Sequence, residues 1–200
     1  MAAFSPITHL LYLHGFRSSP KSTKAQHMAS VMAAQFGQVH WWCPQLPPSP
    51  KAAAELILEG TRDWPAATSA VMGSSLGGFY ATWLASQLDV RAVLINPAVF
   101  PARDLAKHIG EQTTWQAPEE RFYFAPEYVT ELKALEVGAL ENPQRVLAFI
   151  AKGDEVLDWR EMSGRYPNSQ QVVLEGGDHA LSDFEQHVPQ VLQFLQLTAG

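Results

Sequence analysis

Gly73, Ser75 and Gly77 form a Gly-x-Ser-x-Gly pattern between two segments of different character. Residues 66–72 have the apolar pattern of a buried strand, and residues 78–88 have the pattern of a helix. Glycine on each side of the serine allows a very tight turn, because larger side chains there would clash. Strand, tight turn and helix together predict a nucleophile elbow, which lifts a serine hydroxyl above the strand end. The positive end of the following helix favours an anion forming beside that hydroxyl.

Two phosphate-binding motifs share part of this spacing. Gly73 and Gly78 have the outer spacing of a Walker loop. That loop continues with Lys and then Ser or Thr, whereas this chain continues with Phe79 and Tyr80. The dinucleotide fingerprint also fails, because Ser75 stands at its second glycine. The context therefore favours a serine nucleophile over a phosphate site.

A candidate acid and a candidate base follow two further strand patterns. Residues 145–152 lead into Asp154, and residues 171–174 lead into His179. Both side chains come just after the carboxyl end of a strand, where open α/β sheets place their ligands. The order Ser75, Asp154, His179 is the triad order of the α/β-hydrolase fold.

These residue types fit general-base catalysis of acyl transfer. His179 can take the serine proton near neutral pH and later return it to the leaving group. Asp154 would hold the imidazole in the correct tautomer. Asp158 is the alternative acid, although a carboxylate four residues on can simply complement the next helix. Asp178 adjoins the base but is expected to point away from it, and His14 is the other histidine directly after a strand.

An oxyanion hole needs two backbone N–H groups. The first is expected from Leu76, the residue after the nucleophile. The second is expected from the loop after the strand at 7–13, where Gly15 permits a sharp turn before Phe16. His14 would brace this loop through hydrogen bonds. The alternative interpretation is an ordinary glycine that ends a strand.

With these residues in place, the chain resembles the small bacterial α/β-hydrolases of the YqiA esterase type over nearly its full length. This resemblance implies hydrolysis of carboxylic esters, with short-chain acyl esters or acyl thioesters as substrates. The family's nucleophile, acid and base fall on Ser75, Asp154 and His179. Asp178 stands where the family often has Asn, and residues 100–140 match only loosely. The matching motifs lie at 11–16 (Leu-Tyr-Leu-His-Gly-Phe), 18–20, 44–48, 73–78, 81–84, 96–99 (Asn-Pro-Ala-Val), 153–158 and 175–180 (Glu-Gly-Gly-Asp-His-Ala).

Composition limits the partners of the protein. A net charge of −6 argues against nucleic acid, and the single Cys43 rules out an internal disulfide. No histidine pair has metal-ligand spacing, so we expect neither a metal nor a cofactor. Residues 1–6 lack a basic region, which predicts no signal peptide, no membrane span and a cytoplasmic protein. The expected partner is a small ester or thioester.

The apolar runs predict one α/β-hydrolase domain over residues 1–200 with a doubly wound, mostly parallel sheet. Helical patterns separate the runs, and Ser49-Pro50 predicts the start of one helix. The extra antiparallel strands of larger hydrolases are expected to be missing. The six predicted strands are 7–13, 38–43, 67–72, 91–95, 145–151 and 171–174.

The segment 100–140 breaks this alternation, and we expect it to form a small helical lid over the nucleophile. Its aromatic side chains would supply an apolar acyl pocket. The alternative is a packed appendage that touches no substrate. The proline-rich stretch 44–50 is expected either to wall the cleft or to act as a rigid connector. The candidate pocket residues are Trp115, Phe122, Phe124 and Tyr128.

Overall fold

The six predicted strands form one parallel sheet in the computed structural model, which describes residues 5–197. The expectation about a leader rests mainly on residues 1–4, which lie outside that range. Along the sheet the order is β2-β1-β3-β4-β7-β8, and every neighbouring pair is parallel. The strands are β1 (His9–Leu13), β2 (His40–Trp42), β3 (Ser69–Ser74), β4 (Arg91–Ile95), β7 (Val146–Ala151) and β8 (Gln170–Leu174).

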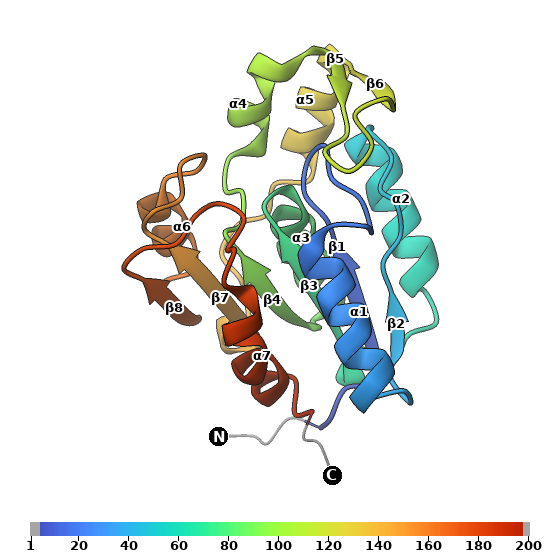
Figure 1. The fold of residues 1–200 in the computed structure, drawn as a ribbon, viewed down its shortest axis with the longest axis vertical. Coiled ribbons are helices and arrows are strands. Elements are labelled where there is room, and N and C mark those ends of the chain that lie inside the picture. The colour runs from blue at the N-terminus through green and yellow to red at the C-terminus, as the bar shows by residue number, and fades with distance from the viewer. Residues whose placement is uncertain (1–4, 198–200) are drawn as a thin grey trace.

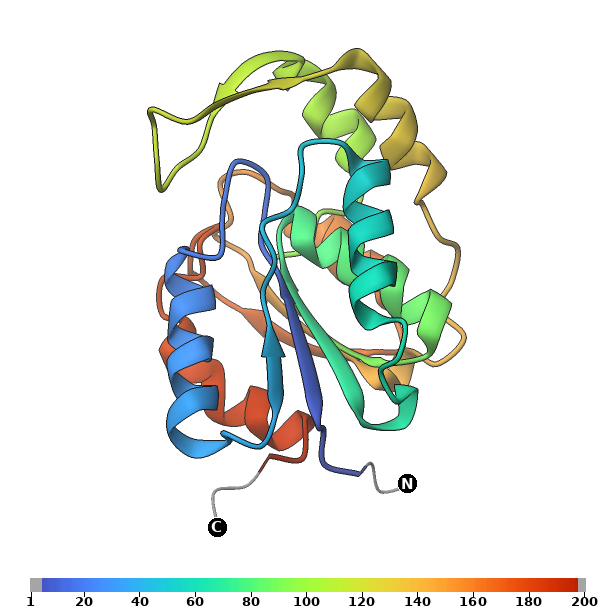
Figure 2. The ribbon, with the colours of Figure 1, turned by 90° about the vertical axis from the view of Figure 1, so that its right-hand side faces the viewer.

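Helices cover both faces of this sheet, as Figures 1 and 2 show. One face carries α1 (Thr23–Gln35) and α7 (Val188–Phe194), and the other carries α2 (Pro50–Thr61), α3 (Leu76–Leu88) and α6 (Trp159–Arg165). The predicted start of α2 is confirmed, because Ser49 accepts a hydrogen bond from the Ala52 N–H. Within residues 5–197 no helix has the length and apolarity to cross a membrane.

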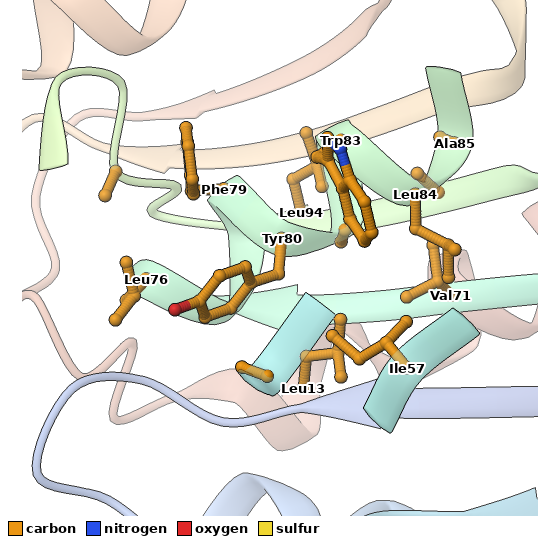
Figure 3. Packing of buried hydrophobic residues seen from close by; sticks show 14 of the residues in the cluster. Leu13, Ile57, Val71, Leu76, Phe79, Tyr80, Trp83, Leu84, Ala85 and Leu94 are labelled. Atoms are coloured by element: carbon orange, nitrogen blue, oxygen red, sulfur yellow. The ribbon is translucent and has the colours of Figure 1, made fainter. Parts of the chain in front are cut away.

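Side chains alternate between the two faces along each strand. In β7, Leu147 and Phe149 pack towards α1 and α7, whereas Ala148 and Ile150 pack towards α2 and α3. Figure 3 shows the second layer, where side chains of β1, β3 and β4 meet those of α2 and α3. Burial on both faces explains why the strands are continuous apolar runs. This packing also holds in place the carboxyl ends of the strands, next to which the candidate site residues lie.

The expectation of a helical lid is only partly met. Between β4 and β7 the chain forms α4 (Pro101–Leu105), the antiparallel pair β5 (Gly110–Thr113) and β6 (Arg121–Phe124), and α5 (Pro126–Ala134). This segment lies above the carboxyl ends of the parallel strands (Figure 1). A hairpin therefore reaches over the sheet edge where sequence patterns favoured helices alone.

Candidate active site

The turn between β3 and α3 holds Ser75 in a backbone conformation that side-chain-bearing residues rarely adopt, with φ 55° and ψ −120°. A Cβ on Gly73 would lie 2.1 Å from the Gly77 carbonyl oxygen. A Cβ on Gly77 would lie 1.9 Å from the Leu13 carbonyl oxygen. The two glycines are therefore required for this turn, and the turn presents the Ser75 hydroxyl beside the start of a helix.

We expect Gly77→Ala to lower the free energy of unfolding by roughly 3 kcal/mol or more, because backbone of β1 and α3 must separate. Urea denaturation measures this change. Gly138→Ala is the matched control, since a Cβ there meets nothing within 4 Å. Equal unfolding midpoints for the two variants would contradict the close packing of the elbow.

The structure brings Ser75, His179 and Asp154 into one hydrogen-bonded chain. His179 Nε2 lies 3.0 Å from Ser75 Oγ, and His179 Nδ1 lies 2.7 Å from Asp154 Oδ2. The Asp154 side chain is fully buried. Its second oxygen accepts hydrogen bonds from the N–H groups of Val156 and Leu157, both at 2.8 Å. A carboxylate held in this way fixes an Nδ1–H tautomer, which leaves Nε2 free to accept the serine proton.

The competing carboxylates have other roles in the structure. Asp158 is the N-cap of α6 and accepts a hydrogen bond from the Arg160 N–H at 2.9 Å. Asp178 accepts from both the N–H and the hydroxyl of Ser182, and these bonds lower the pKa of the Asp178 carboxyl. Each of these carboxylates therefore stabilises local backbone rather than the imidazole.

The two predicted oxyanion donors flank the nucleophile. Leu76 is the first residue of α3, so its N–H has no acceptor within that helix. On the other side, a Cβ on Gly15 would lie 3.2 Å from Ser75 Cβ, which brings the following Phe16 N–H close to the serine. No hydrogen bond among the described residues uses either N–H. Both can thus donate to an anion that forms at Ser75.

His14 braces the loop that carries Phe16. The Leu46 N–H donates to His14 Nε2 at 3.0 Å, so Nδ1 carries the ring proton and donates to the Gly15 carbonyl at 3.0 Å. Burial lowers the pKa of His14, which keeps the ring neutral and consistent with these two bonds. The predicted supporting role of His14 thus has a clear geometry.

Residues of the hairpin formed by β5 and β6 contact the same loop. The Arg17 guanidinium donates to the Thr113 carbonyl at 2.7 Å and to its hydroxyl at 2.9 Å. The Trp115 N–H donates to the Arg17 carbonyl at 2.8 Å, and the guanidinium stacks 4.0 Å from the Trp115 ring centroid. The Phe16 ring packs edge-on against Phe122. The hairpin is therefore well placed to support the oxyanion loop.

Two cavities share the loop formed by residues 14–18 as part of their walls. The first, of about 360 Å³, contains Ser75 and His179 in its wall and is called the His179 cavity below. The second, of about 410 Å³, has Leu76 in its wall and is called the Leu76 cavity. The proline-rich stretch contributes Leu46, Pro47 and Pro48 to the wall of the Leu76 cavity. This placement favours the interpretation of the stretch as a wall of the cleft.

The aromatic residues predicted for the acyl pocket divide into two pairs. Phe122 lines the Leu76 cavity, and the exposed Trp115 lines the His179 cavity. The prediction that Phe124 lines the acyl pocket is wrong, because its side chain is 1% exposed and packs in the core against Tyr128. Neither Phe124 nor Tyr128 lines either cavity. Phe122 and Phe124 share one face of β6 and both pack against Phe16, but Phe124 at the end of the strand lies in the core while Phe122 stays partly exposed.

Asn96 is a site residue that the sequence did not single out as one. It is fully buried with φ 40° and lies directly after β4. Its amide donates to the carbonyls of Asp178 and His179, at 3.0 and 3.1 Å, and its oxygen accepts from the Ala151 N–H at 2.8 Å. It therefore joins the end of β4 to β7 and to the histidine loop. In the sequence, the position of Asn96 directly after the apolar run 91–95 was the feature that could have indicated a site residue.

Comparisons with known proteins agree with this architecture. A model of the Uncharacterised protein family (UPF0227) matches residues 9–196. UPF0227 protein YE1706 of Yersinia enterocolitica is 26% identical over 132 residues, which cover 66% of this chain and 67% of that protein. UPF0227 protein YcfP of Salmonella arizonae is 27% identical over 128 residues, which cover 64% of this chain. The chain therefore spans less than two thirds of the length of that relative, 64%.

Solved structures show the same fold. Alpha/beta hydrolase domain-containing protein 10 from mouse superimposes with a TM-score of 0.70 at 14% identity, covering 96% of this chain and 92% of its own. The esterase Pf2001 of Pyrococcus furiosus gives a TM-score of 0.62 at 14% identity, covering 98% and 83% respectively. The described chain therefore has the α/β-hydrolase fold.

Proposed function

The chain belongs to the Uncharacterised protein family UPF0227, and from its site geometry we propose that it is a serine carboxylesterase that acts on short-chain acyl esters. The observation that carries this proposal is the connected series of hydrogen bonds from Ser75 through His179 to Asp154. General hydrolase chemistry fits the family's fold, since esterases are among the similar structures. The choice of ester over other substrates rests on the site.

In the first half of the proposed reaction, Ser75 Oγ bonds to the acyl carbonyl carbon while His179 Nε2 takes the hydroxyl proton. The carbonyl oxygen becomes an oxyanion that faces the N–H groups of Phe16 and Leu76. The bond from carbon to the alcohol oxygen then breaks, and imidazolium Nε2–H gives its proton to that oxygen. The alcohol leaves, and an acyl-Ser75 ester remains.

In the second half, His179 takes a proton from water as the water oxygen bonds to the acyl carbon. The same two N–H groups hold the second oxyanion. The bond to Ser75 Oγ breaks, the proton returns to that oxygen, and the carboxylic acid departs. Asp154 stabilises the imidazolium in both halves, because one oxygen of its buried carboxylate accepts from His179 Nδ1 while the N–H groups of Val156 and Leu157 hold the other.

We also propose that residues 100–140 act as a lid within a single catalytic domain. Two observations support this proposal. Arg17 donates hydrogen bonds to Thr113 of the hairpin, and Trp115 and Phe122 line the cavities. In this role the segment covers substrate and holds the Phe16 loop at the correct distance from Ser75. These contacts favour the lid over the alternative interpretation, in which the segment is an appendage that touches no substrate.

A hydrolysis screen tests the proposed function. Ethyl esters of increasing acyl length should show the highest kcat/KM at short chains, because a longer apolar chain would meet the charged groups of Arg17, Glu120 and Arg121 in the wall of the Leu76 cavity. Ethyl butyrate and S-ethyl thiobutyrate form a matched oxygen and sulfur pair. After division by each compound's rate with hydroxide, the oxygen ester should show the larger acceleration. A larger acceleration of the sulfur ester would favour an acyl thioesterase, and no turnover of any ester would favour a non-catalytic binding protein.

A further inference from the structure

The two cavities that share the loop of residues 14–18 can be assigned to the two halves of an ester. Residues His14, Gly15, Phe16 and Ser18 form part of the wall of both cavities. A carbonyl oxygen held by Phe16 and Leu76 therefore sits between them. The acyl chain and the alcohol leave the carbonyl carbon in different directions, so each half can occupy one cavity. This step rests on the proposed esterase function.

The position of the base decides which half goes where. His179 must give its proton to the alcohol oxygen as the acyl-enzyme forms. The alcohol therefore has to leave on the side of His179, whose cavity also includes Ala180 and Ser182. The acyl chain is left with the Leu76 cavity. Apolar groups of Leu46, Pro47 and Phe122 in that wall suit an apolar acyl chain.

The wall of the His179 cavity carries many polar groups beside apolar ones such as Trp115 and Phe184, and several of the polar groups make no hydrogen bond to the described protein. The hydroxyls of Ser18, Ser22 and Thr23 make no hydrogen bond within residues 5–197. Ser22 is the N-cap of α1, yet its side chain makes no capping bond. The Gln116 amide oxygen accepts from Ser19, which leaves the amide N–H groups available. Donors and acceptors thus stand together along the wall.

The charges in this wall have both signs. Lys24 donates to the Ala180 carbonyl, and burial lowers the pKa of its ammonium. Glu185 pairs with His27, with 3.2 Å between Oε1 and Nδ1. Because Lys24 and Glu185 lie in the same wall, the attraction of a charged alcohol to one of them is offset by its repulsion from the other. A neutral group with many hydroxyls avoids that opposition and can both donate and accept.

From these contacts we propose that the alcohol half of the substrate is a neutral polyhydroxy alcohol, such as a glycerol or sugar hydroxyl, esterified with a short apolar acid. The polyol binds in the His179 cavity against Ser18, Ser22 and Gln116. The acyl chain binds in the Leu76 cavity. The protein is thus specific for the leaving group as well as for the acyl chain.

Four butyrate esters that differ only in the alcohol test this specificity. They are the esters of glycerol, ethanol, glycerol phosphate and choline, each scaled by its rate with hydroxide. The glycerol ester should have a kcat/KM roughly tenfold above that of ethyl butyrate, because two or more hydrogen bonds form in the cavity. A preference for the phosphate ester or for choline would overturn the neutral-polyol assignment, as would equal values for glycerol and ethanol.

The variant Ser18→Ala/Ser22→Ala tests the residues named in the proposal. The ratio of kcat/KM for the glycerol ester over ethyl butyrate should fall by roughly tenfold. Ser30→Ala, on the same helix but outside the cavity wall, is the control and should keep the ratio. An unchanged ratio in the double variant contradicts the proposal. Since neither hydroxyl bonds to the protein, the fold should persist, and single Ser18→Ala provides a second reading.

Failure of the esterase assignment itself would look different. In that case the wild-type protein hydrolyses none of the four esters, and no comparison between alcohols arises. Hydrolysis of all four at similar scaled rates instead retains the esterase and removes only the polyol specificity. The two results therefore separate the proposed function from the inference built on it.

Discussion

Replacing Ser75 by alanine should lower kcat for ester hydrolysis by on the order of 10⁶-fold. The loss is large because the hydroxyl forms the covalent bond to the acyl carbon, and its base and oxyanion donors cannot act without it. The fold should be retained, because within residues 5–197 Ser75 Oγ hydrogen-bonds to His179 alone, and alanine would adopt the same backbone angles at a free-energy cost similar to that of serine. Steady-state kinetics with ethyl butyrate measure the effect.

Two controls make the Ser75→Ala result decisive. Urea denaturation should give nearly the same unfolding midpoint as the wild type, and Ser86→Ala should keep most of the activity because this exposed serine of α3 lies outside both cavity walls. A folded Ser75→Ala protein with undiminished turnover would remove Ser75 from the reaction altogether.

Asp154→Asn should lower kcat by on the order of 10⁴-fold, with a smaller effect on KM. The Asn amide can donate to His179 Nδ1, which favours the tautomer that carries its proton on Nε2. That tautomer cannot accept the Ser75 proton. The buried position of Asp154 leaves no water to replace the lost carboxylate. Measurements of kcat against pH with wild type and variant test this prediction.

Asp158→Asn is the matched substitution for the alternative acid. Asn is as good an N-cap as Asp, so the bond to the Arg160 N–H should persist and both stability and kcat should change little. If Asp158→Asn loses activity and Asp154→Asn keeps it, the roles of the two carboxylates are reversed.

The sheet and its order of elements could be predicted from the sequence because the four central strands are buried on both faces. Such strands are continuous apolar runs, and all six were confirmed to within a few residues. The elbow was visible for a related reason. Gly73 and Gly77 are needed where backbone approaches backbone, so their spacing in the chain reports the shape of the turn directly.

The hairpin at 110–124 could not be predicted because its strands are short and mostly half-exposed. Residues 110–113 read Gly-Glu-Gln-Thr, which has no apolar alternation, and Thr113 at the end of β5 bonds to Arg17, which is distant in the chain. The same non-local packing buries Phe124. Without knowledge of the pairing, its aromatic ring was interpreted as part of a substrate pocket.

The polar wall of the His179 cavity was invisible in the sequence for a different reason. Ser18, Ser22 and Lys24 belong to the loop and helix after β1, more than 150 residues before the histidine loop that they face. Only the fold places α1 and the residues after β8 on the same side of the sheet. Asn96 likewise acts on residues distant in the chain, through its bonds to Asp178 and His179, 82 and 83 residues on.

Reaction with a fluorophosphonate probe, followed by peptide mapping, tests the central claim most directly. An activated serine with an oxyanion hole attacks the phosphorus and keeps the probe. The account predicts one labelled residue, Ser75, with much slower labelling in His179→Ala. A wild-type protein that stays unlabelled, or that carries the probe on another residue, would contradict it.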